Sequence, residues 1–185
     1  YGVIALTTIT KQRHQLSENI LGIVHPNKFV YSETFIQAHI ERLPVKKEVL
    51  YGGYMPSHSK NDRPLISNGM IPRMRRAILR RVLPLPVGYF HTEALKSFFQ
   101  KNNVNVVLAE YGQTGLAVLN ACLECSIPLV VHFHGFDAFD QRVVNEIGSY
   151  YPRLFEKSSS IVAASKSMRD RLVELGAPAG KIFVN

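Results

Sequence analysis

The sequence predicts an α/β fold: a Rossmann-like, doubly wound and mostly parallel sheet with helices on both faces. Three observations lead to this fold class. From residue 92 onward, short apolar runs alternate with segments of helical periodicity. The apolar runs lack the polar alternation of half-exposed strands, which indicates strands buried on both faces. With 185 residues and 46% hydrophobic content, the chain is large enough for one such domain with its own core.

The first elements are less regular. Residues 1–18 show little periodicity and are expected to form a leader or a poorly ordered arm. A short buried strand is expected at 19–25, and a helix at 32–43. Ser32 is a good N-cap for that helix, and Glu33 suits its positively polarised end.

A second strand and a basic helix follow. The strand is expected at 47–51, where two glycines end it, and the helix at 71–83. Pro72 lies in the first turn of that helix and Pro84 follows its last residue, as helix boundaries favour. One helix face carries Ile71, Met74, Ile78 and Val82, and the opposite face carries Arg73, Arg76 and Arg80.

The second half of the chain alternates helix and strand. Helices are expected at 92–102, 113–125, 141–157 and 166–175, and strands at 104–109, 128–133, 160–164 and 181–184. The last helix has the clearest boundaries, because Ser165 can cap it and Gly176 with Pro178 can end it. Its residues Met168, Leu172 and Leu175 are expected to face the core.

The net charge of +8 is concentrated in one region. Between residues 63 and 92 there is no acidic residue, although six arginines fall there. Such a region attracts anions, which leaves three interpretations open: an ordinary solvated face, contact with an anionic membrane surface or a phosphate-bearing acceptor, and nucleic-acid binding. Nucleic acid is not expected as a partner, because no helix-turn-helix, zinc finger or aromatic RNA-binding strand is recognisable.

Neither a membrane-spanning run of about 18–20 apolar residues nor a signal peptide is recognisable. The two cysteines, Cys122 and Cys125, weakly favour a reducing compartment, so we expect a cytoplasmic location. Their C-x-x-C spacing falls near the end of a helix without a second pair, which favours packing over a zinc site.

The most informative segment is 129–137, where an apolar strand runs into two histidines, a glycine and an aspartate. Ligands bind at such strand ends in open α/β sheets. His132 and His134 alternate along the strand and so point to the same side, and Asp137 could add a carboxylate to a metal site. No histidine follows His134, however, so the further ligands of hydrolase metal sites are missing. We favour a functional, metal-free histidine over a metal site or a purely structural pair.

Two helix starts offer backbone N–H groups to an anion. One is the turn Glu110-Tyr-Gly-Gln-Thr-Gly115, which contains Tyr111 and Gly112, and the other is the segment Ser32-Glu33-Thr34. Both would lie at carboxyl ends of strands, beside His134. The glycine patterns of dinucleotide folds and of P-loops are missing, as is the nucleophile elbow of a serine hydrolase.

Several segments together resemble the N-terminal domain of family 4 (group 1) retaining glycosyltransferases of the GT-B fold. The resemblance covers 19–185 and rests on five short stretches in the same order as in the family. They are the S-E-T-F-I run at 32–36, A-E-Y-G-Q-T-G at 109–115, P-L-V-V-H-F-H-G-F-D at 128–137, the S…R-x-x-L-x-x-L-G stretch at 165–176, and K-I-F-V-N at 181–185.

The resemblance implies transfer of a sugar from a nucleotide-sugar donor to an acceptor, with retention at the anomeric carbon. It implies a catalytic place for His134 and Asp137, and neither a metal nor another cofactor. The implied cleft that holds substrate and donor phosphate is lined by Ser32, Glu33, Thr34, Tyr111, Gly112, Gly135 and Ser165.

The resemblance also implies partners and a setting. The acceptor would be a glycan or a lipid-linked diphosphate in cell-surface polysaccharide or glycolipid synthesis, at the inner face of the cell membrane. Arg73, Arg76 and Arg80 would contact membrane or acceptor phosphate. The C-terminal donor-binding domain is absent from this sequence, so the chain alone is expected to be inactive. Two alternatives stay open: a metal-dependent hydrolase built on His132, His134 and Asp137, or a non-enzymatic basic module that binds anions or nucleic acid.

Overall fold

The computed structural model describes residues 19–28, 33–60 and 62–185. The arm expected at 1–18 and the residue Ser32 lie outside this range. One eight-stranded sheet organises the described chain, in the order β4-β3-β2-β1-β5-β6-β7-β8. Its strands are β1 (Ile20–Val24), β2 (Lys46–Tyr51), β3 (His58–Ser59), β4 (Arg63–Pro64), β5 (Val104–Glu110), β6 (Leu129–Phe133), β7 (Ser160–Ala163) and β8 (Ile182–Val184). All pairs from β2 to β8 are parallel, which confirms the predicted sheet.

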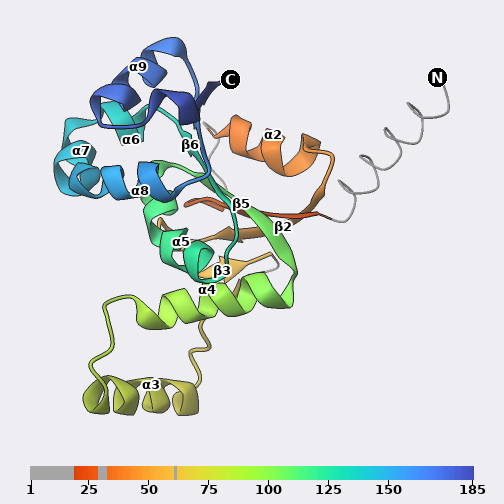
Figure 1. The fold of residues 1–185 in the computed structure, drawn as a ribbon. Coiled ribbons are helices and arrows are strands. Elements are labelled where there is room, and N and C mark those ends of the chain that lie inside the picture. Colours follow the sequence, from red (N-terminus) through yellow and green to blue (C-terminus); the bar gives the residue numbers. More distant parts are fainter. Residues whose placement is uncertain (1–18, 29–32, 61) are drawn as a thin grey trace.

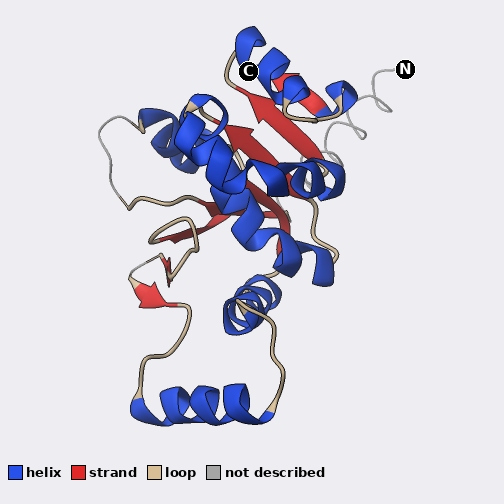
Figure 2. Cartoon of the chain, turned by 90° about the vertical axis from the view of Figure 1, so that its left-hand side faces the viewer, coloured by secondary structure: helices blue, strands red, loops and turns tan. Residues whose placement is uncertain are grey.

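Helices lie on both faces of this sheet (Figures 1 and 2). They are α2 (Thr34–Arg42), α3 (Met70–Val82), α4 (Tyr89–Lys101), α5 (Gly112–Glu124), α6 (Phe136–Phe139), α7 (Gln141–Ile147), α8 (Tyr151–Lys157) and α9 (Lys166–Glu174). The fold class is therefore the doubly wound α/β architecture that the alternation of apolar runs and helices predicts.

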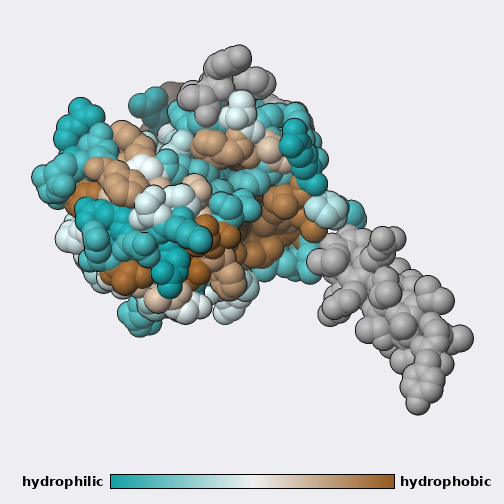
Figure 3. All heavy atoms as spheres, turned by 90° about the horizontal axis from the view of Figure 1, so that it is seen from above, coloured by the Kyte–Doolittle hydropathy of each residue, from teal (hydrophilic) through white to brown (hydrophobic). Residues whose placement is uncertain are grey.

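The core forms where α5 crosses β5 and β6, with α4 and α8 on either side of it. Its largest fully buried side chains include Tyr151, Phe99, Phe133 and Phe155. In α9, Met168 and Leu172 are buried as predicted, and Ser165 caps the helix by accepting a hydrogen bond from the Met168 amide. Away from this core, the face seen in Figure 3 mixes small apolar and polar patches, as on ordinary protein surfaces.

Five features of the secondary structure differ from the prediction. The helix expected at 141–157 is divided into α7 and α8 by a 3₁₀ turn at Gly148–Tyr150, because Pro152 cannot donate a hydrogen bond within a continuous helix. The short helix α6 and the antiparallel hairpin of β3 and β4 were not predicted. The helix α4 begins three residues earlier than expected, and α2 begins at Thr34 with Glu33 at the N-cap.

The helix α3 differs most from the rest of the molecule. Its position and its amphipathic pattern match the prediction, but none of its residues is buried. It lies beyond α4, at the opposite end of the molecule from α9, and two loops connect it to the body (Figure 1). Within the described residues, no helix has the length and apolar character that would be needed to cross a membrane.

Candidate functional site

The strand order creates a crevice at the carboxyl ends of β1 and β5. From β1 the chain passes through α2 to β2 on one side, whereas β5 pairs with β1 on the other side. Neighbouring connections therefore leave in opposite directions, and ligands bind at such switch points in open α/β sheets. His25 follows β1, Glu110 ends β5, and His132 pairs in register with Glu110 on the adjacent β6.

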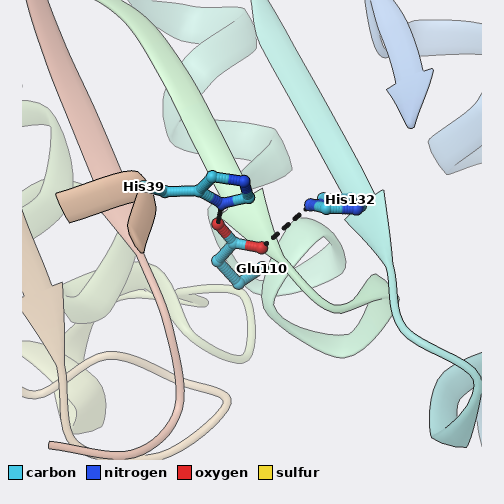
Figure 4. Close-up of side chains that lie close together, drawn as sticks. All are labelled: His39, Glu110 and His132. Carbon is cyan, nitrogen blue, oxygen red and sulfur yellow. Dashed lines mark hydrogen bonds and ion pairs between the residues drawn. The ribbon is translucent and has the colours of Figure 1, made fainter. Parts of the chain in front are cut away.

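Glu110 is the centre of a cluster of side chains at this edge. Its carboxylate is fully buried and contacts three imidazole rings. Oε1 lies 2.6 Å from His39 Nδ1, and Oε2 lies 2.7 Å from His134 Nε2 and 3.4 Å from His132 Nδ1. Figure 4 shows His39 reaching the carboxylate from α2 while His132 approaches from β6. One acidic side chain thus joins three elements that are distant in sequence.

The histidines keep this carboxylate charged. Burial raises the pKa of Glu110, but the hydrogen bonds from His132, His134 and His39 outweigh burial and hold that pKa well below its ordinary value. An ionised carboxylate only accepts, so the ring nitrogens that hydrogen-bond to it carry hydrogens. Burial lowers the pKa of His134, more than the contact with Glu110 raises it, so this ring is neutral near pH 7. Its Nδ1 is then a hydrogen-bond acceptor.

Aromatic rings fix the orientation of His134. Phe35 from α2 stacks on it with ring centroids 4.0 Å apart, and Tyr111 meets it edge-on at 4.9 Å. The Tyr111 hydroxyl donates to Glu33 Oε1 at 3.0 Å, and Asn27 Nδ2 donates to the same oxygen at 2.9 Å. The His134 side chain is only 6% exposed, so few orientations of the ring fit this enclosure.

Asp137 is enclosed more completely than the sequence suggests. It is fully buried, and its two carboxylate oxygens accept the backbone N–H groups of Gly112 at 2.8 Å and of His134 at 2.9 Å. Burial raises its pKa to about 6, although these N–H groups act in the opposite direction. The carboxylate thereby joins the N-terminus of α5 to the loop after β6. The Gly112 N–H, which was predicted to contact a donor phosphate, instead donates its hydrogen bond to Asp137.

Two glycines have a steric reason to be glycine. Gly135 has φ +89°, a left-handed conformation that side chains disfavour, and it turns the chain from β6 into α6. At Gly112 an added Cβ would lie 2.7 Å from the Phe133 ring and 2.9 Å from the Tyr151 hydroxyl. Close packing of α5 on its neighbours therefore requires glycine at this position, independently of any ligand.

The remaining predicted residues divide into two groups. Glu33 and Tyr111 lie beside His134, whereas Thr34 is exposed at the first position of α2 and Ser165 is occupied as the cap of α9. The arginines of the predicted phosphate patch, Arg73, Arg76 and Arg80, are all on α3 and so do not join the cluster around Glu110.

Among the described residues, the donor atoms of His39, Glu110 and His132 all lie within 4.8 Å of one another. Two imidazoles and a carboxylate can hold zinc. The metal alternative from the sequence used a different set, because it relied on Asp137, whose oxygens here accept backbone N–H groups. If an ion binds, Glu110 rather than Asp137 supplies the carboxylate.

Sequence reasoning assigned no role to Glu110 or His39. The available signal was a charged residue that directly extends the apolar strand at 104–109, because an acid at a buried strand end needs partners. Nothing in the periodicity of α2 indicates that His39 supplies one of them.

A pocket of about 600 Å³ opens beside the N-terminus of α5. Tyr54, Gln113, Phe136 and Glu146 are among its lining residues. It combines apolar walls with a few polar groups, as sites for small polar molecules do. Tyr54 connects the pocket to the cluster around Glu110, because its ring meets the Tyr111 ring edge-on with centroids 6.4 Å apart, and Tyr111 in turn contacts His134.

The chain matches the model of Glycosyltransferase Family 4 over residues 37–184. No curated protein matches it in sequence. Among solved structures, Anabaena HepE in complex with UDP-glucose is similar with a TM-score of 0.57 and 15% identity, over 90% of this chain and 43% of that one. The S. aureus MnaA–UDP structure is similar with a TM-score of 0.55 and 12% identity, over 90% of this chain and 44% of that one. The UDP-N-acetylglucosamine 2-epimerase from Rickettsia bellii has a TM-score of 0.52 and 14% identity, also over 90% of this chain and 44% of that one.

These structures share the fold of this chain, which spans less than half the length of each. The match to the family model, in contrast, extends from Gln37 in α2 to β8 and so contains all the members of the cluster: His39, Glu110, His132 and His134. The chain therefore belongs to Glycosyltransferase Family 4.

Proposed function

We propose that this chain is the acceptor-side half of a retaining glycosyltransferase, which transfers a hexosyl group from a nucleotide sugar to a glycan or lipid-linked acceptor. The family match supports the reaction class. HepE and MnaA, whose structures contain UDP-glucose and UDP, support a nucleotide-sugar donor. The observation that carries the proposal is the oriented, neutral imidazole of His134 at the switch point of the sheet.

In this proposal His134 lies beside the donor sugar and the acceptor hydroxyl. Its Nε2–H donates to Glu110, so Nδ1 accepts a hydrogen bond from a substrate hydroxyl. Asp137 acts as a positioning residue, because its carboxylate holds the backbone of His134 and Gly112. Glu33, Tyr111 and Gly135 shape the cleft around the ring.

The other half of the reaction belongs to a second domain. We propose that this domain binds the donor, so that the present chain alone has little or no activity, and that transfer requires no metal or cofactor. The diphosphate leaving group can be stabilised by N–H groups at helix N-termini and by basic side chains. The pocket beside α5 is the proposed place for the acceptor. We place the reaction in cell-surface polysaccharide or glycolipid synthesis, at the cytoplasmic face of the membrane.

The test is transfer of a labelled sugar by the full-length protein, with a panel of nucleotide sugars as donors. His134→Ala is expected to lower the rate about a hundred-fold or more, as removal of one transition-state contact does. His58→Ala, on the hairpin, is the matched control and should leave the rate unchanged. Full activity of His134→Ala would contradict the proposed role of this residue.

The metal alternative has one supporting observation, the proximity of His39, Glu110 and His132. Metal analysis of the purified protein, with and without a chelator, separates the two functions. Substoichiometric metal and activity that survives chelation support the metal-free transferase. One tightly bound zinc per chain, together with a chelator-sensitive hydrolase activity, would contradict the transferase proposal and support a metal-dependent hydrolase.

A further inference from the structure

The helix α3 exposes an entire apolar face. The exposed fractions are 72% for Ile71, 62% for Met74, 56% for Ile78 and 71% for Val82. These four residues recur at helical spacing and form one stripe. In an ordinary surface helix such a stripe packs on the core, whereas here the core lies on the far side of α4. The amphipathic sequence pattern is therefore not explained by packing within the described chain.

The rest of α3 is strongly basic, with Arg73, Arg76 and Arg80 opposite the apolar stripe and Arg75 and Arg81 at its edges. The helix contains Arg73, Arg75, Arg76, Arg80 and Arg81 and no acidic residue. Of these, Arg80 lies over the ring of Phe90 with its guanidinium carbon 5.2 Å from the ring centroid, and none forms an ion pair among the described residues. The absence of acids continues on both sides of the helix, from residue 63 to residue 92. This end of the molecule is therefore both apolar and positively charged.

We propose that α3 docks on an anionic lipid bilayer and lies in the plane of its interface. Ile71, Met74, Ile78 and Val82 would enter the boundary of the acyl chains, while the arginines contact lipid phosphates. In-plane helices combine an apolar face with a basic face in this way. The long arginine side chains can reach headgroups beside a buried stripe, because their apolar stems lie along the interface.

Other occupants fit these observations less well. A nucleic acid would use the arginines but leave the apolar stripe in water. A second copy of α3 would cover the stripe but would bring two arginine-rich helices together, and like charges repel. An anionic bilayer satisfies both faces at once, which is why charge complementarity selects it.

The experiment is cosedimentation of the 185-residue chain with vesicles of phosphatidylcholine, with and without phosphatidylglycerol. We expect binding to the anionic vesicles only. Arg73→Gln combined with Arg81→Gln should weaken it about twenty-five-fold, since one arginine near an anionic surface contributes about five-fold. Met74→Gln combined with Ile78→Gln should weaken it at least about ten-fold, through lost apolar burial. Lys101→Gln combined with Lys166→Gln removes the same charge from exposed positions elsewhere and should have little effect.

A fluorescent reporter tests insertion directly. The chain has no tryptophan, so Ile78→Trp introduces the sole indole. We expect its emission to shift to the blue on anionic vesicles and to be quenched by lipids brominated in their acyl chains. Emission unchanged by vesicles would overturn the proposal, as would equal binding to phosphatidylcholine alone.

Three further results would also overturn it. Complete competition by inorganic phosphate at matched ionic strength would assign a soluble anion site. Binding to a DNA fragment that is unaffected by Met74→Gln and Ile78→Gln would assign nucleic acid. Dimerisation abolished by the same pair of substitutions, without vesicle binding, would assign a second copy. The inference is independent of the proposed transfer reaction, because His134→Ala leaves α3 intact and should bind vesicles like the unaltered chain.

Discussion

At the scale of single residues, Glu110 and Asp137 show two ways in which a buried carboxylate is stabilised. Glu110 is surrounded by imidazoles, which hold its pKa low. Asp137 depends on backbone N–H groups and has a pKa of about 6, so it is more costly to keep charged. Both charges are tolerated because each oxygen has a hydrogen-bond partner.

Replacing Glu110 tests the electrostatic link to α2. The hydrogen bond to Glu110 raises the pKa of His39 despite partial burial, so Glu110→Gln should lower that pKa. Titration of histidine Cε1 resonances by NMR measures the change. His91, whose pKa is lowered by burial alone, is the internal reference and should titrate as before. An unchanged His39 titration would contradict the pairing.

The same pair predicts a pH dependence of stability. Because the pKa of His39 is higher in the folded chain than in the unfolded chain, its charge stabilises the fold fully below about pH 6.5. This contribution is lost as the pH rises through the folded-state value. The unaltered chain and His39→Gln should therefore differ less in unfolding free energy once the pH exceeds the folded-state pKa of His39, as urea titrations at several pH values would measure. If this difference becomes larger with rising pH instead, folding lowers the pKa of His39 and the prediction is wrong.

Asp137→Asn is expected to destabilise the chain by about 1–3 kcal/mol. The amide places an NH₂ group against one of the two backbone N–H donors, which leaves a buried donor without an acceptor. Urea denaturation measures the loss. Asp140→Asn is the matched control, because Asp140 caps α7 at a more exposed site and asparagine caps equally well. Equal stability of the two variants would show that the Asp137 carboxylate is not needed.

At the scale of elements, the approach of α5 to β6 and α8 depends on the lack of a side chain at Gly112. Gly112→Ala inserts a methyl group between the Phe133 ring and the Tyr151 hydroxyl. Overpacking of this kind costs about 1–3 kcal/mol. Gly180→Ala, where an added Cβ meets nothing within 4 Å, should be neutral or stabilising by about 0.4–1 kcal/mol. Thermal unfolding of the two variants compares them, and a neutral Gly112→Ala would show that α5 can shift away.

At the scale of the whole molecule, α3 contributes contacts at one end but buries no residue. Replacing residues 70–82 with a glycine-serine linker of equal length should leave the cooperative unfolding of the body within about 1 kcal/mol of the original, because little burial is lost. The urea midpoint and the slope of the transition measure this. A large loss of stability would mean that α3 supports the core after all.

The sequence predicts the structure best in segments whose conformation is set by a pattern of neighbouring residues. Apart from Asn105, every residue of β5, β6 and β7 is buried or partly buried, so the apolar runs of these strands identify them without further information. The cap at Ser165 and the core face of α9 are local and were equally predictable. The hairpin of β3 and β4 was missed, because strands of two residues show no periodicity.

The candidate site was predictable only in part. His134 and Asp137 stand out at a strand end, but the partners of Asp137 are backbone N–H groups, one of them at the start of another helix. His39 and Glu110 are 71 residues apart, and the residue pattern of neither segment indicates that the two side chains form a hydrogen bond.

By itself, the sequence determined the fold class, most helix and strand positions, the histidine-bearing strand end and the amphipathic basic helix. The tertiary structure decided which carboxylate faces the histidines, that Asp137 positions backbone rather than meeting solvent, and that the apolar stripe of α3 is exposed. The physical reason is the range of each interaction. Periodicity and capping act within a few residues, whereas hydrogen-bond partners and burial depend on chain segments that only the folded sheet brings together.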